Sequence, residues 1–549
     1  MTKLVSAVLV GPAAVAALWA GQAGRADAAT CADLARLALP HAQITLAGEV
    51  LGGEFRDDTR LPDDEIHHYR DLPPFCRVRG VSRPTEGSEI TFEVWLPLQR
   101  WTHRLHMVGN GGYSSNLYYA QMAQRLRAGD VAVATDTGHR GKDLSFGYGR
   151  PEKIADFAHR AVHESVVAAK QVTAAYYGAP AAHAYFSGCS TGGYQALMEA
   201  QRYPDDFDGI IAGAPGNNRS ALNMAFLWNY QANHRPGQDA HAILDAPALK
   251  LINRAAVARC DALDGVKDGV INDPRICRFD LVAQRCGAAP ARACLTPEQI
   301  AAARKIYAGP RDPRTGAQIY PGYPFGGEGV MASADDEHPG WTGYWADPDR
   351  PTQPQRVDFF RQWTFDDPAW SWWGFDWSRD PARVRAKMSA VFDATSPDLR
   401  PFERHGGKLV MFMGWADPVG APPEAINYFR AMRAATPGAD GFARLYMVPG
   451  MAHCAGGPGA TNMSSATRDS LPPVSDARHD MAVALQDWVE QGRAPGALIA
   501  THYAEGAAPR RVAFQRPLCP YPQVARYRGG PPALASSFAC AAPRTSPKG

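Results

Sequence analysis

The sequence predicts an α/β protein, an open sheet with helices packed on it, interrupted by one long insertion. Short apolar segments with strand character alternate with helical spacing over the first 216 residues. The alternation fades over residues 217–395 and resumes at Lys408. Two late strands then end in loops that carry Asp417 and His453, where open α/β sheets place their functional groups. The strands expected before the insertion are residues 91–96, 104–108, 131–134, 183–186 and 209–212.

Residues 1–28 have the composition of a signal peptide. Lys3 gives a short positive region, residues 4–20 are apolar, and the small residues around Ala28 suit cleavage. The apolar run is short and is interrupted at Gly21, so we expect cleavage near Ala28 rather than a retained membrane anchor. The mature protein would be secreted or periplasmic, and residues 29–216 would form the first part of its core.

Ser190 lies at the centre of a Gly-x-Ser-x-Gly pattern, between an expected strand and an expected helix at residues 194–203. Strand, tight turn and helix form the context of a nucleophile elbow, in which a strained turn exposes the serine hydroxyl. Gly188, Gly192 and Gly193 provide the small neighbours that such a turn needs. A structural turn is the alternative, because the pattern is common by chance. With these flanks, the pattern predicts the α/β-hydrolase fold with Ser190 as the nucleophile.

A glycine-rich segment follows the expected strand at residues 104–108. In this fold class such a loop supplies one amide of the oxyanion hole, and the residue after the nucleophile supplies the other. We therefore assign the hole to Gly112, in preference to Gly111, and to Thr191. A plain glycine turn is the alternative.

Asp417 and His453 complete the expected catalytic triad. In α/β hydrolases the chain order is Ser, then Asp or Glu, then His, and these two residues follow that order. Each comes just after a buried strand, at residues 408–413 and 443–448. Taken singly, they would indicate a turn and a loop histidine. Together they predict that Asp417 orients His453, which acts as the base.

Residues 217–395 are interpreted as a lid domain, and residues 396–549 as the second part of the core. The interval is rich in Asp, Pro, Gly and Trp, and it is too long and too cysteine-rich for a disordered linker. Lids of this kind cover the site and shape its specificity.

The densest aromatic stretch of the chain, residues 359–377, belongs to this lid. It forms either lid core or part of an acyl pocket. The expected substrate contacts are Trp373 in this stretch and Trp415 and Val419 beside the acid. Arg361 is the basic candidate for a free carboxylate on the substrate.

Three carboxylates recur over a short loop in the lid: Asp261, Asp264 and Asp268. Ca²⁺ takes carboxylate and backbone carbonyl oxygens, and the carbonyls of Val266 and Val270 could complete the set. The spacing is not that of an EF-hand. A solvated acidic loop is the alternative, and the residues themselves leave both open.

Composition excludes some functions. The net charge of +2 and the lack of a basic run argue against a nucleic-acid partner. No later segment is long and apolar enough to cross a bilayer. The ten cysteines are even in number and form no Cys-x-x-Cys pair, which favours disulfides in an exported protein over zinc sites.

The pairs Cys189-Ser190 and His453-Cys454, with Asp417 between them, resemble the signature of the tannase and feruloyl esterase family, which includes the mono(2-hydroxyethyl) terephthalate hydrolases. The likeness covers nearly the whole mature chain. Further matching segments are residues 109–113, 135–139 and 516–522.

One position departs from the family pattern. Met413 stands where the family usually has the His of His-Gly-x-x-Asp, so we expect the pocket beside the acid to differ. The resemblance implies an esterase for aromatic acyl groups: gallate, ferulate or another hydroxycinnamate, or a terephthalate half-ester. It also implies a structural calcium in the lid loop.

Proximity in sequence and the resemblance together imply five disulfides, of which one would hold the nucleophile loop beside the base loop. The expected pairs are Cys31–Cys76, Cys189–Cys454, Cys260–Cys277, Cys286–Cys294 and Cys519–Cys540.

The leading hypothesis is a secreted serine esterase that acts on a small aromatic ester. Ser190 attacks the ester carbonyl, His453 transfers the proton, and Asp417 holds the imidazole tautomer. A secreted serine peptidase of the same fold is the first alternative, and a non-catalytic binding protein with a calcium-held lid is the second. The substrate and the oligomeric state stay open at this point.

Overall fold

The computed structural model describes residues 1, 28–56, 68–287, 293–329, 340–347, 349–467, 470–504 and 510–543. The predicted signal peptide, residues 1–28, lies almost wholly outside these ranges. Within them, no helix combines the length and the apolar character that a membrane span requires.

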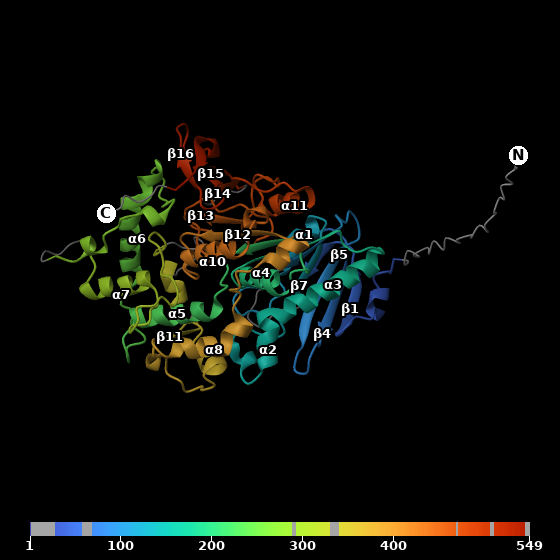
Figure 1. Cartoon of the computed structure of the whole chain (residues 1–549), viewed down its shortest axis with the longest axis horizontal. Helices are drawn as coiled ribbons and strands as arrows, with labels where there is room; N and C mark the ends of the chain where they lie inside the picture. Colours follow the sequence, from blue (N-terminus) through green and yellow to red (C-terminus); the bar gives the residue numbers. More distant parts are fainter. Residues whose placement is uncertain are drawn as a thin grey trace.

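A mixed sheet of nine strands runs through the described part of the chain (Figure 1). Its order is β1-β4-β5-β7-β6-β8-β9-β12-β13, antiparallel from β1 to β7 and parallel from β7 to β13. The carboxyl ends of the parallel strands therefore meet at one edge, where an α/β site is expected. The strands are β1 (Ala42–Val50), β4 (Phe75–Ser82), β5 (Ile90–Pro97), β6 (Arg104–Val108), β7 (Val131–Thr135), β8 (His183–Cys189), β9 (Gly209–Gly213), β12 (Lys408–Gly414) and β13 (Ala443–Val448).

Helices cover both faces of this sheet, because successive strand residues point to opposite sides. On β8, Phe186 packs in the cluster with α3, α4 and α10, whereas Tyr185 packs in the cluster with α11. Helix α1 covers the same face as α11, toward the amino-terminal strands. These helices are α1 (Tyr119–Arg127), α3 (Ala161–Tyr177), α4 (Thr191–Arg202), α10 (Pro422–Ala435) and α11 (Met481–Gln491).

The amino-terminal strands β1 and β4 form an antiparallel extension that the sequence analysis did not identify. Arg77 on β4 is 8% exposed, and its Nε donates to Glu93 Oε1 on β5 at 2.6 Å. The hydroxyl of Tyr119 donates to the other oxygen of Glu93 at 2.6 Å. A charged residue in a strand usually indicates a solvent face, and here the ion pair is buried beneath a helix instead.

The chain between the adjacent parallel strands β9 and β12 forms the insertion. Its hydrophobic cluster also includes residues of the flanking core, such as Tyr113, Phe157 and Val419. In Figure 1 the green-to-yellow helices lie at the left, and the blue strands β1 and β4 lie at the right. The two ends of the insertion meet, since the amide of Ala394 donates to the carbonyl of Asn217 at 2.9 Å. Its elements are α5 (Arg219–Asn233), α6 (Ala246–Cys260), α7 (Pro297–Ala308), β10 (Ala346–Asp347), β11 (Arg350–Pro354) and α8 (Asp380–Phe392).

The remaining elements are short. Two further pairs of strands follow α11, β14 with β15 and β16 with β17, and the second pair lies in the segment that the Cys519–Cys540 disulfide closes. The structure contains the five disulfides that were expected. The other bounds are β2 (Gly53–Arg56), β3 (His68–Leu72), α2 (Pro151–Ala155), α9 (Arg400–His405), β14 (Leu498–Tyr503), β15 (Val512–Leu518), β16 (Val524–Tyr527) and β17 (Phe538–Ala541).

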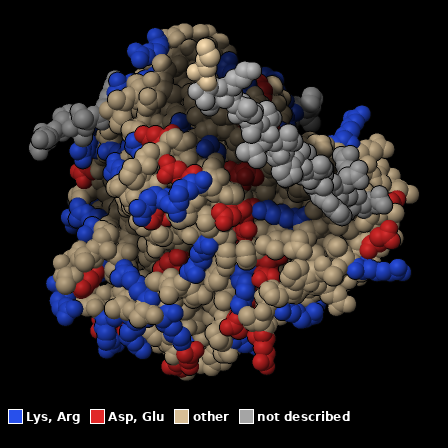
Figure 2. Space-filling view, turned by 45° about the vertical axis from the view of Figure 1, so that its right-hand side comes forward, with Lys and Arg blue, Asp and Glu red and all other residues tan. Residues whose placement is uncertain are grey.

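Basic and acidic side chains are interspersed over the face of the molecule shown in Figure 2. This distribution matches the net charge of +2 over 549 residues.

Candidate active site

Ser190 occupies the turn between β8 and α4. Its φ of 62° and ψ of −118° lie in a region that costs a residue with a side chain about 1–3 kcal/mol. The Ser190 amide donates to the carbonyl of Gly213 at 3.0 Å, which ties the turn to β9. A Cβ on Gly193 would lie 2.0 Å from that same carbonyl oxygen, and one on Gly188 would lie 2.6 Å from Gly192. The glycines of the motif are thus required by close packing around the serine.

Asp417 and His453 are hydrogen-bonded to each other past the ends of β12 and β13. His453 Nδ1 lies 2.7 Å from Asp417 Oδ2. The other carboxylate oxygen accepts the amides of Val419 at 2.8 Å and Gly420 at 3.3 Å. The carboxylate is fully buried, so these bonds fix its direction. With Nδ1 facing the carboxylate, Nε2 is the ring nitrogen left to exchange a proton with a nucleophile.

Ser190 and His453 line one cavity of about 330 Å³. The disulfide between their neighbours, Cys189 and Cys454, holds the two loops with Cα atoms 5.8 Å apart. The acid loop is joined to the base loop as well, because the amide of Ala416 donates to the carbonyl of Met451 at 3.0 Å. All three triad loops are therefore tied to one another.

The lining of this cavity is mainly polar and comes from both the core and the insertion. Arg356 is the one side chain bearing a full charge among the described lining residues, and it comes from the insertion. Besides Ser190 and His453, the polar lining includes Asn110, Tyr118, Gln121, Ser187, Gln355 and Thr467. Arg356 lies in a part of the lid without regular pattern, so no sequence signal pointed to it.

The expected oxyanion-hole residues lie at the same place. Gly112 lines the cavity with a φ of 56°, and Thr191 is the first residue of α4. The hydroxyl of Thr191 donates to the carbonyl of Gly112 at 2.6 Å, so the two segments are in direct contact. Stabilisation of an oxyanion by the two amides stays a prediction.

Comparison with known proteins identifies the family to which the chain belongs. A family model described as tannase and feruloyl esterase matches residues 76–541. The chain belongs to this family. It is therefore a carboxylic ester hydrolase, and the predicted α/β-hydrolase fold is confirmed.

Individual relatives cover most of this family member. An uncharacterised esterase of Xanthomonas campestris pv. campestris is 38% identical over 550 residues, covering 95% of this chain and 92% of the relative. The mono(2-hydroxyethyl) terephthalate hydrolase of Piscinibacter sakaiensis is 32% identical over 535 residues, covering 86% and 85%. The crystal structure of feruloyl esterase B from Aspergillus oryzae superposes with a TM-score of 0.83 at 26% identity, covering 93% and 99%.

In this esterase the three expected substrate contacts lie outside the set of described residues that line the cavity. The indole of Trp373 donates to Asp239 Oδ1 at 3.1 Å. Trp415 is 4% exposed and lies under the guanidinium of Arg275, and the carbonyl of Val419 accepts the hydroxyl of Tyr323. Contacts between these three residues and a substrate stay a prediction.

Arg361, the expected partner for a substrate carboxylate, is also engaged elsewhere. Its guanidinium donates to the carbonyl of Trp370 at 3.1 Å and to Gln353 Oε1 at 3.1 Å. It is not among the described residues that line the cavity, where Arg356 provides the positive charge instead.

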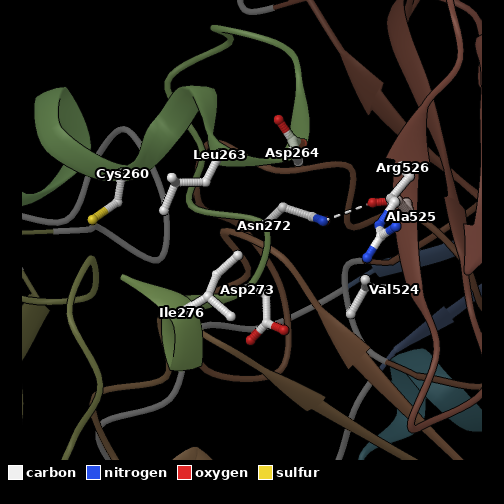
Figure 3. Close-up of a pocket in the computed structure, with 9 residues that line it drawn as sticks. All are labelled: Cys260, Leu263, Asp264, Asn272, Asp273, Ile276, Val524, Ala525 and Arg526. Carbon is white, nitrogen blue, oxygen red and sulfur yellow. Dashed lines mark hydrogen bonds between the residues drawn. The ribbon is translucent and has the colours of Figure 1, made fainter. Parts of the chain in front are cut away.

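The loop expected to bind calcium, residues 261–273 and here called the Asp loop, lies away from the catalytic cavity. Asp261 accepts the amides of Asp268 at 3.0 Å and Gly269 at 2.9 Å, and Asp268 Oδ2 pairs with Arg516 at 2.5 Å. Figure 3 shows Asn272 of this loop pointing toward Ala525, whose carbonyl it binds at 2.9 Å. Among the described side chains, no group of three or more His, Cys, Asp or Glu residues is arranged to hold a metal ion.

Proposed function

We propose that this protein hydrolyses esters of aromatic acids through an acyl-enzyme on Ser190. The observation that carries the proposal is the 2.7 Å contact of His453 with buried Asp417, at a cavity that His453 shares with Ser190. His453 takes the proton of Ser190 as the hydroxyl attacks the ester carbonyl and returns it to the leaving alcohol. Water then releases the acid, with Asp417 holding the imidazole in the productive tautomer throughout.

The charge of the cavity bears on the acyl group. Galloyl, feruloyl and terephthaloyl esters all fit the family, and only a terephthalate half-ester carries a carboxylate opposite its ester. The guanidinium of Arg356 is suited to such a carboxylate. The guanidinium carbon of Arg356 lies 5.1 Å from the ring centroid of Tyr113 and 4.9 Å from that of Phe226. We therefore rank mono(2-hydroxyethyl) terephthalate first among the three ester types.

The experiment measures turnover of methyl gallate, methyl ferulate and mono(2-hydroxyethyl) terephthalate, with Ser190→Ala as the blank. Ser190-dependent turnover of at least one ester is expected, and Arg356→Gln should lower kcat/KM for the terephthalate ester while sparing methyl ferulate. Substantial turnover by Ser190→Ala would contradict the mechanism. Cleavage of chromogenic peptides in preference to all three esters would favour the peptidase alternative.

We also propose that the protein is exported. Disulfides persist in oxidising compartments and are rare in the cytosol. The five disulfides of this structure therefore support a secreted or periplasmic enzyme. The amino-terminal sequence of the mature protein, isolated from its natural source, tests this. A chain that begins close to Cys31 is expected, and a chain that retains Met1 would contradict it.

A structural calcium ion in the Asp loop is the last part of the proposal. The donor set suits a hard cation: the carboxylates of Asp261, Asp264 and Asp268 with the carbonyls of Val266 and Val270. Burial, together with the negative charges of Asp268 and Asp261, raises the pKa of Asp264 to about 6. A bound cation would relieve that repulsion and brace the loop. No step of the reaction depends on it.

A further inference from the structure

Arg219, the first residue of α5, lies buried beside both residues expected to form the oxyanion hole. Its Nη2 donates to the hydroxyl of Thr191 at 2.8 Å and to the carbonyl of Gly112 at 3.3 Å. The Thr191 hydroxyl donates in turn to the same carbonyl at 2.6 Å. One guanidinium nitrogen thus connects the glycine-rich loop with the start of α4.

Four aromatic rings surround the guanidinium of Arg219, and the residue as a whole is only 1% exposed. The guanidinium carbon lies 5.2 Å and 5.0 Å from the ring centroids of Tyr113 and Tyr194. The corresponding distances to Phe157 and Phe392 are 5.9 Å and 5.7 Å. A buried charge is costly unless its surroundings compensate, and the faces of aromatic rings attract a guanidinium. Because Tyr113 follows Gly112 and Tyr194 belongs to α4, the cage uses the same two segments that Arg219 joins.

Arg219 also belongs to the neck of the lid, which we define as residues 217–220 and 393–394. The amide of Ala394 donates to the carbonyl of Asn217 at 2.9 Å, and the amide of Ser220 donates to Asp393 Oδ1 at 2.7 Å. The position of the guanidinium therefore depends on both ends of the insertion.

We propose that Arg219 is a positioning residue for the oxyanion hole and links the neck of the lid to transition-state stabilisation. The proposal rests on the function given above, in which the amides of Gly112 and Thr191 face the developing negative charge. By holding a carbonyl and a hydroxyl of these two residues, Arg219 fixes the peptide segments that carry the amides. Its positive charge also has the sign that favours an oxyanion in a water-poor site. Arg219 acts through the two residues and does not contact the reacting atoms.

The first test compares Arg219→Met and Arg219→Lys with the parent enzyme. Loss of an oxyanion-hole donor itself costs about 100- to 1000-fold in kcat, so a misplaced hole should cost about 10- to 100-fold, with KM nearly unchanged. Rates are expressed per active site, counted by complete reaction with a fluorophosphonate probe. Arg77→Met is the matched control, because Arg77 is a buried arginine of the sheet that pairs with Glu93 and is not among the described residues that line the cavity, so its removal should spare kcat per titrated site.

A second readout separates positioning from general loosening of the fold. An aryl boronic acid, which becomes tetrahedral on Ser190, should lose affinity in proportion to the loss of kcat. Inhibition by the product carboxylic acid should hardly change, because that ligand does not develop the oxyanion. Equal weakening of both inhibitors, or a loss of kcat in Arg77→Met equal to that in Arg219→Met, would overturn the proposal.

Thr191 variants keep the test decisive if Arg219→Met does not fold. Thr191→Val removes the hydroxyl but keeps the amide, and should lower kcat about tenfold. Thr191→Ser keeps the hydroxyl and should stay within about threefold of the parent. Unchanged kcat in both Thr191→Val and Arg219→Lys would overturn the proposal. Turnover that survives Ser190→Ala would instead reject the catalytic mechanism, so the two failures are distinguishable.

Discussion

Two contacts between the lid and the core differ in what they join. The neck meets the core at the nucleophile elbow, through the hydrogen bonds of Arg219 to Thr191 and Gly112. The Asp loop meets the core at the carboxyl-terminal segment, through Asp268 with Arg516 and through Asn272 with Ala525 (Figure 3). One contact therefore reaches the two residues expected to form the oxyanion hole, and the other joins the lid to the carboxyl-terminal segment.

The difference suggests a division of labour, which we propose, in which the neck of the inserted domain serves catalysis and the Asp loop serves stability. The Asp loop approaches the site only indirectly: Val270 packs against Gly450, in the turn that precedes His453, where an added Cβ would lie 3.0 Å from it. Changes at the neck should therefore lower kcat, whereas changes at the Asp loop should lower the free energy of unfolding and leave kcat of the folded enzyme nearly unchanged.

The largest loss of kcat is expected from a change in the proposed catalytic triad. Asp417→Asn should lower kcat by about four orders of magnitude, because an amide at this position favours the wrong imidazole tautomer. The melting temperature should change little by comparison, since the amide oxygen can still accept the amides of Val419 and Gly420. Steady-state kinetics and thermal unfolding of the same preparation check this. A loss below tenfold would mean that Asp417 is not the orienting acid.

Removal of calcium probes the Asp loop on the stability side. A ligand present at about 100 times its dissociation constant stabilises the fold by about 2.7 kcal/mol. Treatment with EGTA should therefore lower the melting temperature by several degrees, and added Ca²⁺ should restore it. The kcat per titrated active site should stay the same at a temperature where the protein remains folded. No shift in melting temperature would reject the calcium proposal, and a large fall in kcat would break the division between the two contacts.

Arg516→Met tests the anchor of the same loop. Removing the guanidinium takes away the charged hydrogen bond from Arg516 to the part-buried carboxylate of Asp268, so the free energy of unfolding should fall by about 1–3 kcal/mol. Denaturant unfolding measures this, and Arg526→Met is the matched control because Arg526 donates to a carbonyl at an exposed position. An equal effect in the two variants would remove the special role of the Asp268 contact.

Asp393→Ala tests the neck, and its expected effect is the smallest of these predictions. Asp393 accepts the amide of Ser220 at the start of α5, and loss of such a cap costs about 1 kcal/mol of stability. If the neck positions Arg219, kcat should also fall several-fold, and Asp393→Asn, which keeps an acceptor, should recover most of it. A loss of stability without any change in kcat would place the neck in the same class as the Asp loop.

The sequence predicted the parts of the site that local chemistry dictates. The elbow follows from glycines that close packing requires, and Asp417 and His453 follow from their places after two buried strands. The contacts that the lid side chains make with the core could not be predicted in this way. Arg219 and Arg356 lie in the lid, where no period or motif marks them, and only the folded chain brings them beside Thr191 and into the cavity.

The aromatic stretch at residues 359–377 shows a related limit. Its density correctly indicates burial, but burial has two outcomes, core or pocket. In the structure Phe360 and Trp363 are each 1% exposed, and the indole of Trp363 donates to the carbonyl of Leu144 at 2.7 Å. The density of aromatic residues in the sequence does not predict whether a given ring packs in the core or lines a pocket. Strand β4 was not predicted because its charged residues suggested a solvent-exposed segment, whereas Arg77 is buried and Arg79 is part-buried, both paired with buried Glu93.

The most direct test of the catalytic mechanism is mass spectrometry of the enzyme quenched with acid during turnover of an aromatic ester. We predict that the peptide containing Ser190 gains the mass of the acyl group less the hydrogen that it replaces, within one turnover, and that this gain is absent from Ser190→Ala. Turnover without any acyl adduct on that peptide, or an adduct that persists in Ser190→Ala, would contradict the assignment of Ser190 as the nucleophile.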